Sequence, residues 1–287
     1  MSAEILDGRA IARSMRQEIA DDVAQWVDKE GQPPTLAIVQ MGADPASDRY
    51  VRAIERGFKG VGMLVRRVAL AADATQERMA EALEQLGMDD DVQGVIVQLP
   101  LPLHIKESVL HKLSPVKDVD GIHPLNAGLL LQRSKAALVP ATPLGAMELL
   151  RRYNIDVEGK NAVLVGRSRI VGLPMSLLLL HRHATVTVCH TRTRDLAKIT
   201  RTADILAVAV GRPAMITREM VRSGTVVIDF GINLMNGEMV GDVDKGVAEV
   251  ASYITPVPGG AGPMTNIMLM RNTLQAAQRQ RELRDKA

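Results

Sequence analysis

Short apolar runs alternate with helical segments along most of this chain, and this alternation constrains the fold more than any other feature. Strands are expected at residues 35–41, 64–70, 94–99, 162–165, 185–189, 205–210 and 226–230, and the first of them is expected to be buried. Helices are expected at residues 8–29, 46–62, 75–86, 142–153, 173–182, 195–201, 217–221 and 265–284. Such alternation produces parallel strands joined by crossover helices, so the sequence predicts an α/β fold.

The length of 287 residues favours two domains. A loop rich in proline, aspartate and glycine, residues 114–124, separates the two alternating series and is the candidate boundary. The second series carries a strand-to-helix turn of the dinucleotide-binding type, so the C-terminal domain is expected to be Rossmann-like.

Composition excludes several classes of protein. Hydrophobic residues make up 46% and charged residues 24%, which is an ordinary globular mixture. The net charge of +2 and the scarcity of aromatic residues argue against a nucleic-acid binder. Cys189 is the single cysteine, so no intrachain disulfide or cysteine zinc site can form, and no metal is expected. With no membrane-length apolar stretch and no apolar signal core, a cytoplasmic protein is the default expectation.

The strongest local signal is the turn that follows the strand at residues 162–165. Gly166 permits a sharp turn into a helix, and free backbone N–H groups at the helix start can face a pyrophosphate. The pattern departs from G-x-G-x-x-G, because Ser168 replaces the second glycine and Gly172 comes one residue late. An ordinary strand-to-helix turn is the alternative interpretation.

The next strand bears on the choice of dinucleotide. An NAD site usually has an acidic residue there for the ribose 2′-hydroxyl, but residues 190–193 contain none. Arg167, Thr191 and Arg192 can instead meet a 2′-phosphate, which suits the planar fork of arginine. The alternative is that both arginines are solvated loop charges.

Three other loops are unusual. Residues 97–102 place an amide at a strand end before two prolines, residues 115–121 contain two carboxylates, and residues 255–265 are rich in glycine. Ligands of open α/β sheets bind beyond the carboxyl ends of the strands, where these loops are expected. Each alone is a plausible structural turn, but together they indicate one cleft.

These motifs together resemble the bifunctional methylenetetrahydrofolate dehydrogenase/methenyltetrahydrofolate cyclohydrolase family over nearly the whole chain. The matching segments are residues 47–51, 97–102, 115–126, 166–174, 226–233, 241–244 and 255–265. The resemblance implies two α/β domains around a cleft, with the last helix packing back on the first domain. The folate-binding, catalytic domain would comprise residues 1–121 and 268–287, and the NADP-binding domain residues 122–267.

The resemblance also implies a reaction and its residues. It implies that 5,10-methylenetetrahydrofolate is oxidised by NADP⁺ and that the 5,10-methenyl product is then opened by water, usually in a homodimer. Tyr50, Gln98 and Asp120 would be the catalytic residues. The folate would contact Tyr50, Ile54, Val97, Gln98, Leu99, Asp120, Pro258, Gly259, Gly260, Ala261 and Gly262. The dinucleotide would contact Gly166, Arg167, Ser168, Thr191, Arg192 and Ile232.

One departure from the family is critical. The family has a lysine four residues after the tyrosine on the same helix, and that lysine carries the cyclohydrolase step; here the position is Ile54. Two lesser departures are Ala141 and Ala261, where cysteine and valine are frequent. We therefore expect an NADP-dependent dehydrogenase with absent or weak cyclohydrolase activity. A fully bifunctional enzyme, a non-catalytic folate- or dinucleotide-binding relative, and an oxidoreductase with another substrate are the alternatives.

Overall fold

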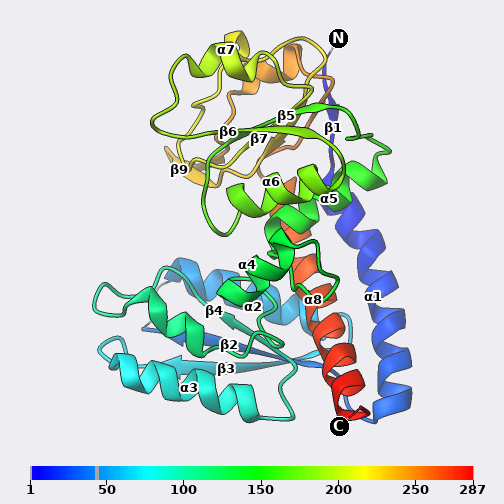
Figure 1. Cartoon of the computed structure of the whole chain (residues 1–287), viewed down its shortest axis with the longest axis vertical. Coiled ribbons are helices and arrows are strands. Elements are labelled where there is room, and N and C mark those ends of the chain that lie inside the picture. The colour runs from blue at the N-terminus through cyan, green and yellow to red at the C-terminus, as the bar shows by residue number, and fades with distance from the viewer. Residues whose placement is uncertain (1, 43–44, 287) are drawn as a thin grey trace. The chain divides into compact units, whose positions relative to one another are not determined.

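The computed structural model describes residues 2–42 and 45–286. The chain divides into two compact units (Figure 1). Unit 1 comprises residues 1–13 and 142–265, and unit 2 comprises residues 14–141 and 266–287. Helices α1 (Gly8–Glu30) and α8 (Ala261–Arg284) each begin in unit 1 and continue in unit 2. No helix within the described ranges has both the length and the apolar character that crossing a membrane requires.

Unit 2 is built on a parallel sheet with the strand order β3-β2-β4. The strands are β2 (Thr35–Met41), β3 (Leu64–Leu70) and β4 (Gly94–Val97). The other elements are α2 (Pro45–Lys59), α3 (Gln76–Met88), a 3₁₀ helix (Glu107–Lys112) and α4 (Pro124–Leu131). The central strand β2 is buried at every residue except Met41, because it pairs with a strand on each side and its faces are covered. The edge strand β3 instead exposes Arg66 and Arg67.

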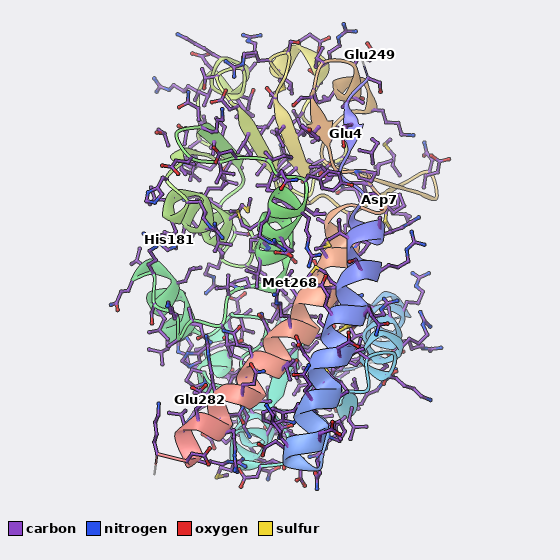
Figure 2. All side chains as sticks on the ribbon, turned by 90° about the vertical axis from the view of Figure 1, so that its right-hand side faces the viewer. Glu4, Asp7, His181, Glu249, Met268 and Glu282 are labelled. Carbon is purple, nitrogen blue, oxygen red and sulfur yellow. The ribbon has the colours of Figure 1, made fainter. Side chains whose placement is uncertain are left out.

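Two helices of unit 2 show how the sequence pattern sets the packing. On α2, Val51, Ile54 and Phe58 recur at helical spacing and are fully buried. Helix α3 begins where expected, because the Thr75 hydroxyl accepts a hydrogen bond from the Arg78 N–H at 3.2 Å. Helix α8 runs beside α1 in this unit (Figure 2).

Unit 1 contains a six-stranded parallel sheet with the order β1-β11-β8-β7-β5-β6 and a separate antiparallel hairpin, β9–β10. The strands are β1 (Glu4–Ile5), β5 (Asn161–Val165), β6 (Thr185–Cys189), β7 (Ile205–Val208), β8 (Val226–Asp229), β9 (Asn233–Met235), β10 (Glu238–Val240) and β11 (Tyr253–Ile254). The helices are α5 (Ala141–Arg152), α6 (Gly172–His181) and α7 (Leu196–Thr200), with 3₁₀ helices at Arg218–Met220 and Lys245–Glu249.

The order of unit 1 contains a topological switch point. The chain passes from β5 outward to β6, then crosses back to add β7 on the other side of β5. Ligands of open α/β sheets bind at such a point, outside the carboxyl ends of the strands. The α/β class and the Rossmann-like C-terminal sheet predicted from the sequence are therefore confirmed.

The boundaries of the units differ from those expected of the domains. Residues 122–141 belong to unit 2 because hydrogen bonds hold them there: the Asn126 amide donates to the Pro115 carbonyl at 2.9 Å, and the Asn272 amide donates to the Val139 carbonyl at 2.9 Å. Residues 1–13 belong to unit 1 because β1 pairs with β11. The function expected of each domain, and a cleft between the two, remain predictions.

Candidate functional site

The turn after β5 requires glycine at two positions. Gly166 has φ +121°, and a Cβ there would lie 2.2 Å from the Ala209 carbonyl oxygen. A Cβ at Gly172, where α6 begins, would lie 2.4 Å from the Gly166 carbonyl oxygen. Since Ala209 directly follows β7, this tight turn lies at the switch point between β5 and β7.

The start of α6 differs from the expectation in one respect. The Ser168 hydroxyl oxygen accepts hydrogen bonds from the N–H groups of Val171 (3.1 Å) and Gly172 (3.2 Å). The protein itself therefore caps these two N–H groups. The sequence had suggested that they are free for a pyrophosphate, and the structure differs from that expectation. The backbone N–H groups of Arg167 and Ser168 have no hydrogen-bond partner within residues 2–42 and 45–286, so they can still meet an anion.

The next turn lies at the same edge of the sheet. Val165 and Cys189 are partners in the β5–β6 register, so the loops that follow them are neighbours. Arg167, Thr191 and Arg192 are all exposed there. The Nδ1 of His190 accepts a hydrogen bond from the Arg192 N–H at 3.1 Å, which helps to shape this turn.

Ile232 is 66% exposed and follows β8, two strands from β5 in the same sheet. The carboxyl end of this sheet thus presents cationic and hydroxyl groups beside β5 and an apolar side chain beyond β8. This arrangement suits a ligand with both phosphate and ring components.

Two buried aspartates that the sequence reasoning did not select shape this edge. Asp242 is fully buried, and its carboxylate accepts hydrogen bonds from the N–H groups of Val210 (2.6 Å), Gly211 (2.9 Å) and Arg212 (2.9 Å). It therefore fixes the loop that follows β7, beside the switch point. The Gly-Asp-Val-Asp segment at residues 241–244 was the available signal, because buried acids after a strand need several donors.

Asp229, at the end of β8, is the second of these aspartates. Its carboxylate accepts hydrogen bonds from the N–H groups of Gly231 (2.8 Å), Asp242 (3.0 Å) and Val243 (3.0 Å). Burial raises the pKa of Asp229 to about 6, against the effect of these hydrogen bonds. Asp229 thus joins the loop after β8 to the segment that carries Asp242.

In the glycine-rich segment at the start of α8, some glycines are required by the fold and one is not. Gly259 has φ +122°, and a Cβ at Gly260 would lie 2.6 Å from the Thr255 side chain, so the fold requires both glycines. A Cβ at Gly262 would meet no atom of the described residues within 4 Å, and no left-handed φ requires glycine there. Pro258 is exposed and Ala261 is buried. Glycine at 262 therefore leaves backbone open to close approach by a ligand.

Unit 2 contributes three polar side chains from separate segments. Tyr50 lies on α2 and is 37% exposed; Gln98 follows β4, where its N–H donates to the Val39 carbonyl at 2.8 Å. Asp120 lies in the loop that β4 holds through the bridge between Val95 and Asp118.

These three groups are available to a ligand. The Tyr50 hydroxyl and the Asp120 carboxylate have no hydrogen bond to any described residue, and the Gln98 amide makes only a long one, 3.4 Å, to the Leu99 carbonyl. Burial, followed by the charge of Asp120, raises the pKa of the Tyr50 phenol, so the two groups interact electrostatically. Burial, followed by the charge of Asp118, raises the pKa of Asp120 to about 7.

Apolar side chains accompany this polar group. Ile54 is fully buried on α2, Val97 is 4% exposed at the end of β4, and Leu99 is half-buried. The basic residues nearest in sequence to Ile54, Arg52 and Arg56, are exposed. The position of Ile54 therefore offers no group that can accept or donate a proton.

A cavity of about 690 Å³ in unit 1 contains none of the cofactor residues expected from the sequence. It lies against the β9–β10 hairpin, and its wall includes Ile5, Met235, Val240 and Asp229. No group of histidine, cysteine, aspartate or glutamate within the described part of the chain is arranged to hold a metal ion.

Known proteins resemble the chain over almost its full length. Residues 6–120 match the model of the tetrahydrofolate dehydrogenase/cyclohydrolase catalytic domain, and residues 140–281 match that of the NAD(P)-binding domain of the same family. The bifunctional protein FolD of Chloroflexus aurantiacus is 53% identical over 279 residues, which cover 96% of this chain and 98% of the relative.

Solved structures of proteins with the same activities are also similar to this chain. The bifunctional FolD enzyme of Campylobacter jejuni has a TM-score of 0.94 and 41% identity, covering 97% of this chain and all of the other. The Trypanosoma brucei dehydrogenase-cyclohydrolase, solved with NADP cofactor and inhibitor, has a TM-score of 0.93 and 37% identity, covering 98% and 99% of the two chains.

Proposed function

The chain belongs to the tetrahydrofolate dehydrogenase/cyclohydrolase family, and we propose that it oxidises 5,10-methylenetetrahydrofolate to 5,10-methenyltetrahydrofolate with NADP⁺ in one-carbon metabolism. The observation that carries this proposal is the group in unit 2. Tyr50, Gln98 and Asp120 come from three segments, and the protein leaves their functional groups without strong partners.

The residue types suit a reduced pterin. The Asp120 carboxylate can accept two hydrogen bonds from the amino-pyrimidinone edge, which presents paired donors. Gln98 can donate and accept, and Tyr50 offers a flat face with a hydroxyl. We propose that Ile54, Val97 and Leu99 form the apolar side of this site. Pro258, Gly259, Gly260, Ala261 and Gly262 would line the folate, and the unobstructed Gly262 supports their close approach to it.

The second ligand is the dinucleotide. NADP⁺, when bound, supplies the hydride acceptor, so the protein needs mainly to orient two rings and exclude water. Gly166, with the free N–H groups of Arg167 and Ser168, would hold its phosphates. Thr191 and Arg192 would contact the 2′-phosphate, and Ile232 would contact a ring. The exposed arginines and the absence of an acid at residues 190–193 support NADP⁺ over NAD⁺.

The second activity of the family, the cyclohydrolase, would be absent or severely reduced in this chain. The relatives are named bifunctional, which favours the alternative of two full activities. Against that alternative stands Ile54, which is fully buried and has no proton to donate or accept. A positioned acid or base commonly contributes about 10²–10⁴-fold to such a step.

One pair of assays separates these possibilities. The protein is given 5,10-methylenetetrahydrofolate with NADP⁺ or NAD⁺, and the formation of reduced dinucleotide is followed by its absorbance. We expect faster reduction of NADP⁺; no reduction at all would favour a non-catalytic binding protein. The protein is then given 5,10-methenyltetrahydrofolate, which should persist at the uncatalysed rate, whereas rapid conversion to 10-formyltetrahydrofolate would establish a bifunctional enzyme.

A homodimer in the cytoplasm completes the proposal. The β9–β10 hairpin exposes Leu234 (79%), Met235 (45%) and Met239 (45%) beside the cavity in unit 1, and a second copy could cover these side chains. Light scattering should give twice 31.1 kDa for the unmodified protein and 31.1 kDa for Leu234→Glu. A monomer mass for the unmodified protein would refute the dimer. The single, free thiol of Cys189 suits a reducing compartment.

A further inference from the structure

We propose that Asp118 is a positioning residue for this reaction: its buried carboxylate folds the turn that carries Asp120 and places a second acidic group beside it. This inference rests on the proposed function, because it takes Asp120 to be the group that contacts the folate. Asp118 itself is fully buried.

The carboxylate of Asp118 organises the chain on the far side of Asp120. It accepts hydrogen bonds from the N–H of Ile122 (3.1 Å), the N–H of His123 (2.8 Å) and the side-chain amide of Asn126 (2.8 Å). Asn126 in turn accepts a hydrogen bond from the Leu138 N–H at 3.1 Å. Every donor that reaches Asp118 therefore belongs to the segment after Asp120.

The turn between these groups has little freedom. The Gly121 N–H donates to the Asp118 carbonyl at 3.2 Å, which closes a turn with Asp120 at one of its two central positions. Gly121 has φ +64°, and a Cβ there would lie 2.6 Å from the Pro140 nitrogen. Asp120 is thus held between a buried anchor on one side and a required glycine on the other.

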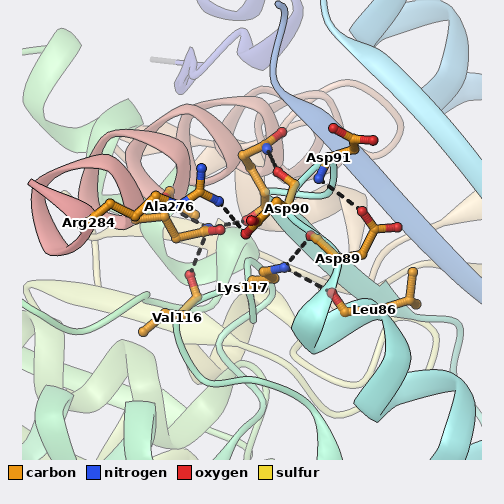
Figure 3. A network of polar contacts seen from close by, with 10 residues as sticks. Leu86, Asp89, Asp90, Asp91, Val116, Lys117, Ala276 and Arg284 are labelled. Carbon is orange, nitrogen blue, oxygen red and sulfur yellow. Dashed lines mark hydrogen bonds and ion pairs between the residues drawn. The ribbon is translucent and has the colours of Figure 1, made fainter. Parts of the chain in front are cut away.

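The chain before Asp118 is anchored as well (Figure 3). Lys117 is buried, and its ammonium donates to the carbonyl groups of Leu86 (3.0 Å) and Asp89 (2.6 Å) at the end of α3. The Lys117 carbonyl accepts a hydrogen bond from the Val95 N–H of β4 at 2.6 Å. The network of Figure 3 continues to α8, where Arg284 pairs with Asp90 at 2.5 Å. Consequently the segment around Asp118 cannot shift without disturbing α3 and β4.

Asp118 also acts through its charge. Burial raises the pKa of Asp118, and its three hydrogen bonds and the charge of His123 act in the opposite direction. The titratable groups that act on Asp120 are Asp118 in the same loop and Tyr50 on α2, and the charge of His123 lowers the pKa of Asp118 itself. Since the charge of Asp118 raises the pKa of Asp120, removing that charge should lower the pKa of Asp120.

Two variants separate placement from charge. Asp118→Asn keeps an oxygen for two of the three donors and removes the charge. Asn126→Ala keeps the charge and removes one donor from the anchor. Asp244→Asn is the matched control, because that carboxylate caps the Gly246 N–H at 2.8 Å in unit 1.

The first measurement does not depend on activity. The carboxyl carbon-13 signal of Asp120, identified by its loss in Asp120→Asn, is titrated in the ligand-free protein. In Asp118→Asn the Asp120 midpoint should move to lower pH, by less than the part of its shift that burial causes, whereas Asp244→Asn should leave it unchanged. A midpoint that stays in place in Asp118→Asn would overturn the electrostatic part of the proposal.

The second measurement is the pH profile of kcat/KM for the folate. Its limb for Asp120 ionisation should move to lower pH in Asp118→Asn and stay in place in Asn126→Ala, whose folate KM should rise by about tenfold or more. An unchanged KM in Asn126→Ala would overturn the placement, even if Asp118→Asn did not fold. If the unmodified protein reduced no NADP⁺, the proposed function would fail, while the carbon-13 titration would still decide the role of Asp118.

Discussion

Replacing Ile54 by lysine tests the account at the point where this chain departs from its family. Ile54 is fully buried between Val51 and Phe58 on α2. The lysine stem can keep much of that packing, but its ammonium must leave water, at a cost of several kcal/mol for a buried ion. We therefore expect the free energy of unfolding to fall by about 2–4 kcal/mol.

The same substitution should create an activity. The lysine would be largely desolvated, which lowers its pKa and makes the amine available to accept a proton near neutral pH. We expect hydrolysis of 5,10-methenyltetrahydrofolate to rise by about 10²–10⁴-fold above that of the unmodified protein. Dehydrogenase activity should change by less than about tenfold, because hydride transfer depends mainly on ring placement.

The assay follows loss of methenyltetrahydrofolate absorbance, with chemical denaturation measured in parallel. Ile54→Met is the matched control, since it keeps an apolar side chain of similar volume and should cost less than about 1.5 kcal/mol. Equal hydrolysis by Ile54→Met and Ile54→Lys would refute the reasoning, and so would rapid hydrolysis by the unmodified protein.

Three further substitutions probe other parts of the account. Gly166→Ala places a Cβ 2.2 Å from the Ala209 carbonyl oxygen and should lower the free energy of unfolding by about 3 kcal/mol or more. Gly128→Ala is the control, because its Cβ meets no described atom within 4 Å and should cost little. Equal thermal unfolding temperatures for the two variants would contradict this. Arg192→Glu should raise the KM for NADP⁺ more than that for NAD⁺, and equal changes in the two kinetic constants would argue against a 2′-phosphate contact. Burial raises the pKa of Asp120 from 3.8 to about 7, so the folded protein holds a proton there that the unfolded chain loses first. This contribution to stability is complete below about pH 4 and is lost as pH rises to about 7. The denaturation midpoint of Asp120→Asn should therefore depend less steeply on pH over that range, and an unchanged dependence on pH would refute this prediction.

The sequence predicted those elements whose signal is local. Strands β2, β3 and β6 have the expected bounds, because each is a short segment rich in apolar or β-branched residues; β3 also contains Arg66 and Arg67. Helix α4 was missed because Pro124 begins it, and a proline after an aspartate- and glycine-rich loop suggested that the loop continued. The helix expected at residues 217–221 is a single 3₁₀ turn, too short for periodicity to distinguish.

The remaining features depend on distant partners. Strands β1 and β11 are two residues each; β1 exists because it pairs with β11, which also pairs with β8, and these partners lie far apart in sequence. Asp118 and Asp120 look alike in sequence, and only the fold shows that one is buried on three donors while the other has none. The roles expected of Tyr50, Gln98, Asp120 and the dinucleotide residues came from resemblance and remain predictions.

The most direct test of the central claim follows the transferred hydride itself. The protein is mixed with NADP⁺ and 5,10-methylenetetrahydrofolate that carries deuterium on the methylene carbon, and both products are examined by mass spectrometry. We expect one deuterium to move to the reduced dinucleotide and 5,10-methenyltetrahydrofolate to accumulate. Unlabelled reduced dinucleotide, or none, would contradict it.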